Sequence, residues 1–389
     1  MKNFIEKFQK HYGVLPAAAS RAPGRLEILG NHTDYNEGFV LSCAVEQNTC
    51  FALTPVEGTL CKVVDFRSGA EMSFDLAEPD APPQKDGGKY IKGMVLELMK
   101  RGMKCTGFNA AIESSVPLSA GMSSSAALEV SAGLALMKAF DFELTPADTA
   151  RAGQGVENNY LGLKSGLLDQ FSSIFGKKNS MILSDFRSVE VLRTVSLPEG
   201  YAIVVINSMK KHNLVDSEYN VRRQDCEEAA QIMTQIVPDS KTLRDITWEQ
   251  LNCARDRMNE RVFRRALHVV GECTRVIEGV RLLEKGDVDG FGQLWFESHE
   301  SSRVNFENST PELDYLVELA RSVPGCLGAR LSGGGFGGIT IHLVKADAAE
   351  EYAKRVTAAY KLRTGISAEY IICAIGNGAE LYPLVPDKD

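Results

Sequence analysis

The 389-residue sequence has no CxxC pair, no run of 18 apolar residues and no excess of positive charge. Its nine cysteines are scattered and odd in number, which argues against a disulfide framework and against a metal cage of Cys and His. A net charge of −8 makes nucleic acid and anionic membranes unexpected partners. No segment is a candidate transmembrane helix, and the charged first 13 residues lack the apolar core of a signal peptide. We therefore expect a cytoplasmic protein with reduced thiols.

The composition, with 44% hydrophobic and 24% charged residues, is typical of a soluble globular protein, and the length favours two domains. Strand and helix patterns are mixed without strict alternation, which predicts an α+β fold. A turn-rich segment over 176–200 divides the expected domains, 1–180 and 181–389. The expected strands are Phe39–Leu53, Leu60–Asp65, Gly107–Ser114, Tyr201–Asn207 and Ile339–Val344. The expected helices are Met1–Gly13, Tyr90–Arg101, Ser124–Phe140, Asp148–Leu161, Val221–Val237, Val262–Leu283, Val288–Ser302 and Ala346–Thr364.

A first segment, Arg21–Gly38, gathers polar side chains between glycines and prolines. Within eleven positions it holds a set of six: Arg25, Glu27, Asn31, His32, Asp34 and Tyr35. Polar groups beside an apolar strand need hydrogen-bond partners, so the cluster predicts a ligand site. The alternative is an exposed loop with ordinary turn chemistry.

A second segment, Val116–Leu128, reads V-P-L-S-A-G-M-S-S-S-A-A-L. It follows an expected strand and opens an expected helix. The free N–H groups and the dipole of a helix N-terminus suit an anion, and glycine lets that anion approach the backbone. Ser123, Ser124 and Ser125 add hydroxyl donors and possible Mg²⁺ ligands. A single serine would cap the helix, so the run of three favours a phosphate site over simple capping.

A third segment, Leu331–Thr340, reads L-S-G-G-G-F-G-G-I-T. Its letters match G-x-G-x-x-G, but a strand follows where a dinucleotide site needs a helix. The glycines indicate close approach of a ligand or loop, or else a tight bend. The sequence also lacks G-x-x-x-x-G-K-[ST], H-R-D, D-F-G and G-x-S-x-G. These absences exclude a P-loop NTPase and a protein kinase, and weaken a serine hydrolase interpretation.

Together, in this order and spacing, the three segments resemble the GHMP kinase superfamily, and most closely its galactokinases. The first is similar to the signature G-R-x-N-x-I-G-E-H-T-D-Y, the second to the phosphate loop P-x-G-x-G-L-S-S-S-A, and the third to G-G-G-F-G-G. Further matches span nearly the whole chain: Gly166–Phe171, Ser217–Arg223, Ser298–His299 and Pro311–Asp314.

The resemblance implies a two-domain α+β fold with the active site in the interdomain cleft. It implies transfer of the γ-phosphoryl of ATP, with Mg²⁺, to the C1 hydroxyl of an aldohexose, with D-galactose the leading substrate. It assigns catalysis to Asp169 and Arg25, and Mg²⁺ to Ser125 and Glu157. It assigns the nucleotide to Gly121, Met122, Ser123, Ser124, Ser125, Ala126 and Tyr90. It assigns the sugar to Asn31, His32, Asp34, Gly166 and Tyr219. We expect a monomer or a weak homodimer.

The chemistry of these residues is consistent with that assignment. Phosphoryl transfer needs positioning, neutralisation of phosphate charge and an acceptor for the hydroxyl proton. A carboxylate acceptor contributes roughly 10²–10⁴-fold, and an arginine stabilises charge on the transferred group. From the residues alone, however, the first interpretation of Asp169 is a structural ion pair or a helix cap. Similarly, Glu157 could lie on an exposed helix face, His32 could be structural, and Tyr219 could be a core aromatic.

Five positions depart from the family pattern, among them Gly87, where many members carry a tryptophan, and Ile339, which replaces a cysteine. Asn31 replaces the signature glutamate, which in the family contacts the C6 hydroxyl of the sugar. Glu27 replaces the signature asparagine, and Ser119 replaces the first glycine of the phosphate loop. Loss of a negative charge at residue 31 could admit a sugar with a C6 carboxylate. The alternatives are therefore the same reaction on another sugar such as galacturonate, and a catalytically silent sugar sensor on the same fold.

Overall fold

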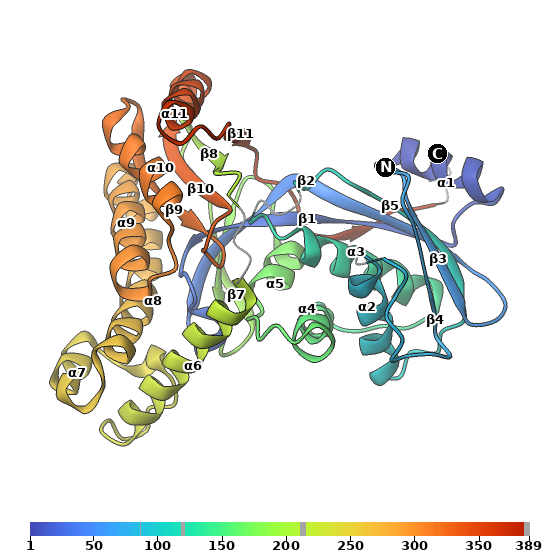
Figure 1. The fold of residues 1–389 in the computed structure, drawn as a ribbon, viewed down its shortest axis with the longest axis horizontal. Helices are drawn as coiled ribbons and strands as arrows, with labels where there is room; N and C mark the ends of the chain where they lie inside the picture. The colour runs from blue at the N-terminus through green and yellow to red at the C-terminus, as the bar shows by residue number, and fades with distance from the viewer. Residues whose placement is uncertain (86, 118–120, 211–214, 385–389) are drawn as a thin grey trace.

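The computed structural model describes residues 1–85, 87–117, 121–210 and 215–384, and they form helices around two β-sheets (Figure 1). The first sheet runs β12-β1-β2-β5-β3-β4, and β6 joins it by pairing with β2 and with β7. Its strands are β1 (Ala18–Leu29), β2 (Phe39–Pro55), β3 (Leu60–Asp65), β4 (Glu71–Asp75), β5 (Phe108–Ser114), β6 (Met181–Asp185), β7 (Glu190–Val195) and β12 (Glu380–Leu381). The second sheet runs in the order β11 (Glu369–Cys373), β8 (Tyr201–Asn207), β10 (Ile339–Lys345) and β9 (Cys326–Ser332). The expected α+β class is confirmed.

Alternating side chains of the first sheet pack against helices on its two faces. Helix α1 (Lys2–Tyr12) lies on the opposite face from α2 (Gly88–Lys100) and α3 (Ser124–Ala139) (Figure 1). The α1 face holds Ala19, Ala52, Val64 and Ala111. The α2–α3 face holds the chain neighbours of these residues: Ala18, Phe51, Leu53, Val63 and Ala110. This two-residue period buries both faces of the sheet.

A second core joins the two sheets. Leu26 and Ile28 of β1 share it with Ile339 and Ile341 of β10. The first polar segment and the C-terminal glycine segment, about 300 residues apart in the chain, are therefore brought together. The remaining helices are α4 (Pro146–Gly155), α5 (Leu168–Phe175), α6 (Val215–Thr234), α7 (Trp248–Cys253), α8 (Glu260–Glu284), α9 (Val288–Ser301), α10 (Pro311–Ser322) and α11 (Ala349–Thr364). No helix in the described ranges combines the length and hydropathy needed to cross a bilayer.

Two expectations about elements need correction. Strand β1 runs through Pro23 and Gly24, which had hidden it within the first segment; its register against β2 shifts on both sides of Arg25. The helix expected over 148–161 is α-helical only to Gly155, the end of α4, and is followed directly by a π-helix, η2 (Val156–Leu161). In addition, β6 and β7 follow residue 180 but belong to the first sheet, so a division at 180/181 would separate them from it. The domain boundary remains a prediction.

Candidate active site

Arg25 and Asp169 form an ion pair across 144 positions of the chain. Arg25 projects from β1 and Asp169 from the first turn of α5. Arg25 Nε donates to Asp169 Oδ1 at 2.8 Å, and Nη2 lies 2.7 Å from the same oxygen. Arg25 is 4% exposed, so the carboxylate partner balances a charge that would be expensive to bury alone.

The phosphate-loop segment closes around this pair. Arg25 Nη1 donates to the carbonyl of Gly121 at 2.7 Å, and the Arg25 amide donates to the carbonyl of Met122 at 3.1 Å. Ser123 Oγ donates to Asp169 Oδ2, the oxygen that Arg25 leaves free. Residues 118–120, which include Ser119, lie outside the described part of the chain.

Helix α3 begins in a conformation that leaves its N-terminus available to an anion. Gly121 and Ser123 both have left-handed φ values, 66° and 54°, which turn the chain sharply into the helix. The Ser123 side chain does not cap the helix, because it is engaged by Asp169. The first-turn N–H groups, beginning at Ser124, are therefore not satisfied by this cap. Ser124 and Ser125 are half-buried, whereas Met122 and Ala126 are buried and offer backbone only.

One cavity, of about 200 Å³, adjoins the ion pair. All nine residues assigned to the sugar, to catalysis and to the metal line it: Arg25, Asn31, His32, Asp34, Ser125, Glu157, Gly166, Asp169 and Tyr219. Glu27, Ser165, Gly333 and Gly334 line it as well. Tyr90 is not part of this wall and packs against the α2–α3 core, so its role at the nucleotide remains a prediction.

The cavity wall is polar but uncharged at His32. His32 has a left-handed φ of 60°, and its ring nitrogens lie 2.9 Å from the Tyr35 hydroxyl and 3.1 Å from the Gly334 carbonyl. The centroid of its ring lies 4.4 Å from that of Phe306 and 5.0 Å from that of Tyr219. Burial lowers the pKa of His32 to about 3, so the ring is neutral. Its Nε2–H donates to the Gly334 carbonyl and its Nδ1 accepts from the Tyr35 hydroxyl, so a contact of His32 with the sugar remains a prediction.

Asp34 and Gly166 are in direct contact. Asp34 Oδ2 accepts a hydrogen bond from the Leu168 amide at 3.1 Å. A Cβ atom at residue 166 would lie 1.8 Å from that oxygen, so only glycine allows Asp34 to reach the cavity from this direction. Desolvation is the main cause that raises the pKa of Asp34, and the nearby Asp169 charge adds to it.

Glu157 is a buried acid beside a second acid. It lies on the π-helix η2, is 6% exposed, and accepts a hydrogen bond from Ser165 Oγ. Burial, reinforced by the Asp169 charge, raises the pKa of Glu157 to about 7. A divalent cation would offset this repulsion, and a carboxylate with a hydroxyl is a donor set that Mg²⁺ accepts while keeping waters. Glu157 and Ser125 line the same cavity, so the residues fit the metal.

Sequence reasoning missed several groups that support the site. Gln170, next to Asp169, donates at 2.8 Å to Glu129 Oε2, which lies behind Glu157. Burial, and then the Glu157 charge, raises the pKa of Glu129 well above its usual range. The one signal for this pair is an acid, Glu129, within the apolar pattern of the expected helix Ser124–Phe140.

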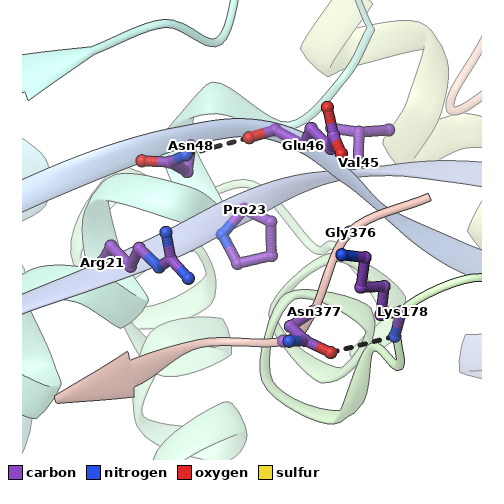
Figure 2. A pocket seen from close by; sticks show the side chains of 9 residues that line it. Arg21, Pro23, Val45, Glu46, Asn48, Lys178, Gly376 and Asn377 are labelled. Carbon is purple, nitrogen blue, oxygen red and sulfur yellow. Dashed lines mark hydrogen bonds between the residues drawn. The ribbon is translucent and has the colours of Figure 1, made fainter. Parts of the chain in front are cut away.

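A second cavity, of about 330 Å³, lies between β1, β2 and the C-terminal segment (Figure 2). Arg21, Glu46, Lys178 and Asn377 are among its lining residues, and none of the predicted site residues is. Arg21 is paired with Glu380 at 2.6 Å, and the Lys178 amide donates to Asn377 Oδ1 at 3.0 Å. This cavity therefore lacks the residues predicted to carry out catalysis.

Three family models match the chain. They are the galactokinase galactose-binding signature over residues 6–55, the GHMP kinases N-terminal domain over 89–177 and the GHMP kinases C-terminal model over 280–362. The first contains Arg25 to Asp34, the second contains the loop 121–125 and Asp169, and the third contains the glycine segment.

Similar proteins align along almost the whole chain. The galactokinase of Actinobacillus pleuropneumoniae serotype 5b (strain L20) is 39% identical over 97% of this chain and 98% of its own. That of Roseiflexus sp. (strain RS-1) is 37% identical over 96% and 95%. The crystal structure of Lactococcus lactis galactokinase complexed with galactose has a TM-score of 0.91 at 31% identity, covering 97% and 99%. A mevalonate kinase structure, with a TM-score of 0.58 at 17% identity, supports the fold alone. The chain therefore belongs to the galactokinase family of the GHMP kinase superfamily.

Proposed function

We propose that this protein transfers the γ-phosphoryl group of ATP to the C1 hydroxyl of D-galactose, giving galactose 1-phosphate and ADP. The observation that carries the proposal is the Arg25–Asp169 ion pair, which adjoins both the loop 121–125 and the polar cavity. Family membership implies ATP as donor. The galactose complex of a 31% identical relative supports galactose as acceptor.

The geometry accounts for how the proton is handled. Asp169 Oδ1 accepts from two nitrogens of Arg25, and Oδ2 accepts from Ser123. A carboxylate oxygen has two lone-pair sites, so Oδ2 keeps one for the sugar hydroxyl. As the sugar oxygen bonds to the γ-phosphorus and the bridge to the β-phosphate breaks, its proton moves to Oδ2. Arg25 and the α3 N-terminus neutralise the phosphate charge.

We propose that Glu157 and Ser125 hold the Mg²⁺ that accompanies ATP, which supplies further neutralisation of phosphate charge when bound. Glu157→Gln is expected to raise the Mg²⁺ concentration for half-maximal activity by roughly 10–100-fold, because an amide is a weaker ligand than a carboxylate. Titration of activity with Mg²⁺ measures this shift. Glu113→Gln is the control, because Glu113 pairs with Lys7 of α1 and is not part of the cavity wall. An unchanged Mg²⁺ requirement in Glu157→Gln would remove Glu157 from the metal site.

Galacturonate is disfavoured as the alternative acceptor. Four carboxylates line the cavity, Glu27, Asp34, Glu157 and Asp169, against the single guanidinium of Arg25, which is already paired. A silent sensor is disfavoured because the Arg25–Asp169 pair and the loop are both formed.

A panel of sugars at fixed ATP and Mg²⁺ tests the proposal. We expect brisk ADP formation with galactose. With galacturonate we expect a kcat/KM at least about 100-fold lower, because the carboxylate of this sugar would lie against the acidic side chains of the cavity. Brisk turnover of another sugar with none of galactose would overturn the choice of substrate. Tight galactose binding without ADP formation would favour the sensor.

We also propose that the protein works in a reducing compartment, the cytoplasm, as a monomer or weak homodimer. Its nine cysteines are all free, and several are buried. Burial raises the pKa of Cys43 to about 12, which keeps that thiol protonated and unreactive.

A further inference from the structure

The side chain of Asn31 has no hydrogen-bonding capacity left for a sugar. Its Nδ2 donates to Glu27 Oε1 at 2.9 Å and to the Gly333 carbonyl at 2.8 Å. Its Oδ1 accepts from Asn308 Nδ2 at 3.0 Å and from Ser302 Oγ at 3.4 Å. A primary amide has two donors and two acceptor sites, and all four are used. Asn31 is also 0% exposed, although it is among the residues that line the cavity.

Glu27 is the reverse case, with one oxygen engaged and one open. Oε1 accepts from Asn31 and from Arg330 Nη2, which is 2.8 Å away on a fully buried side chain. Oε2 accepts no hydrogen bond from the described residues and is not among their fully enclosed polar atoms. Glu27 lines the same cavity as Arg25 and Asp169. A carboxylate oxygen in a buried wall needs a donor, and a sugar hydroxyl is one.

Positions 27 and 31 carry the two residue types of the signature in exchanged order. The signature has asparagine and then glutamate, whereas this chain has Glu27 and then Asn31. Because the two side chains touch at 2.9 Å, the exchange moves the carboxylate across one hydrogen bond and does not remove it from the cavity wall. Arg330 supplies the cation that stabilises the carboxylate in its new place.

We propose that Glu27, through Oε2, accepts a hydrogen bond from a hydroxyl of the sugar and so determines which sugars are accepted. Asn31 is then a positioning residue that holds Glu27 without touching the sugar. This inference rests on the proposed sugar kinase function and names the residue that reads the substrate.

The test compares galactose with its 2-, 3-, 4- and 6-deoxy forms as acceptors. In the unaltered protein, one of the deoxy sugars should have a kcat/KM roughly 100-fold below that of galactose. The hydroxyl that this sugar lacks is the one that donates to Glu27 Oε2, and without it a buried charged acceptor is unpaired. In Glu27→Gln, the same deoxy sugar should lose less than about threefold relative to galactose. Arg330 and Asn31 both require an acceptor, so the glutamine turns its NH₂ group toward the cavity. Persistence of the full 100-fold loss in Glu27→Gln would overturn the proposal.

Two further variants separate recognition from positioning and from folding. Asn31→Ala should lower kcat/KM for galactose and for each deoxy sugar by the same factor, leaving the 100-fold discrimination in place. Disappearance of that discrimination in Asn31→Ala, but not in Glu27→Gln, would return the contact to Asn31.

If Glu27→Gln fails to fold because Arg330 loses its anion, Glu27→Asp keeps the charge but withdraws it by one methylene. It should reduce the discrimination at least tenfold, and unchanged discrimination would contradict the proposal. Failure of the unaltered protein to phosphorylate galactose would instead count against the proposed function.

Discussion

Asp169→Asn should lower kcat by about 10²–10⁴-fold while leaving galactose and ATP binding within about tenfold of the unaltered protein. Asparagine keeps the shape of the side chain and still offers an oxygen to Arg25, but an amide cannot take the hydroxyl proton. Asp169 Oδ2 is the oxygen with a free lone pair in the cavity, since Ser123 uses only one. The rate of ADP formation measures kcat, and titration calorimetry measures the two dissociation constants.

Asp245→Asn is the matched control for that variant. The Asp245 side chain is 22% exposed, close to the 28% of Asp169, and it pairs with Arg187 at 2.8 Å. It is not part of the cavity wall, so its loss should disturb a comparable ion pair without changing kcat by more than about twofold. If Asp169→Asn kept more than a tenth of the original kcat, Asp169 would not be the proton acceptor.

Gly166→Ala should weaken galactose binding by roughly 10–100-fold, the value of a hydrogen bond to a charged group. The new methyl would lie 1.8 Å from Asp34 Oδ2, so Asp34 must move and give up its bond from the Leu168 amide. ATP binding should be unchanged, because the three atoms nearest to the new methyl all belong to Asp34 and none to α3. Calorimetric titration with galactose, and separately with ATP, measures the split.

Gly162→Ala provides the control within the same loop. Gly162 has a left-handed φ of 76°, but no atom lies within 4 Å of a Cβ placed there. Backbone strain in Gly162→Ala should therefore lower the free energy of unfolding by about 1 kcal/mol, which a lower melting temperature would report. The galactose affinity of this variant should be unchanged. Equal losses of affinity in the two variants would indicate loop strain and not displacement of Asp34.

Periodic elements could be predicted from the sequence, whereas the irregular ones that carry the site could not. Helix α8 and strand β10 follow their apolar patterns over enough residues to be unambiguous. Strand β1 contains Pro23 and Gly24, which ordinarily interrupt a strand. Helix α5 has only eight residues, too few for a clear period. Arg25 and Asp169 therefore lie on two elements that the local pattern did not identify.

The candidate site was predicted by motif order and not by local physics. By itself the residue pattern around Asp169 favours a structural ion pair or a helix cap, and the contact of Asp169 with Arg25 spans 144 positions. The contact between Glu27 and Asn31 crosses the irregular end of β1, where neither helix nor strand spacing applies. Such contacts depend on tertiary packing, so two separate departures from the signature are recognisable as one exchanged pair only in the folded chain.

Incubation of the purified protein with ATP, Mg²⁺ and galactose labelled with ¹³C at C1 tests the central claim most directly. If the cavity presents the anomeric hydroxyl to Asp169 and the phosphate loop, the C1 resonance of the product will be split by phosphorus. A product phosphorylated at any other carbon, or release of ADP without formation of a sugar phosphate, would contradict the claim.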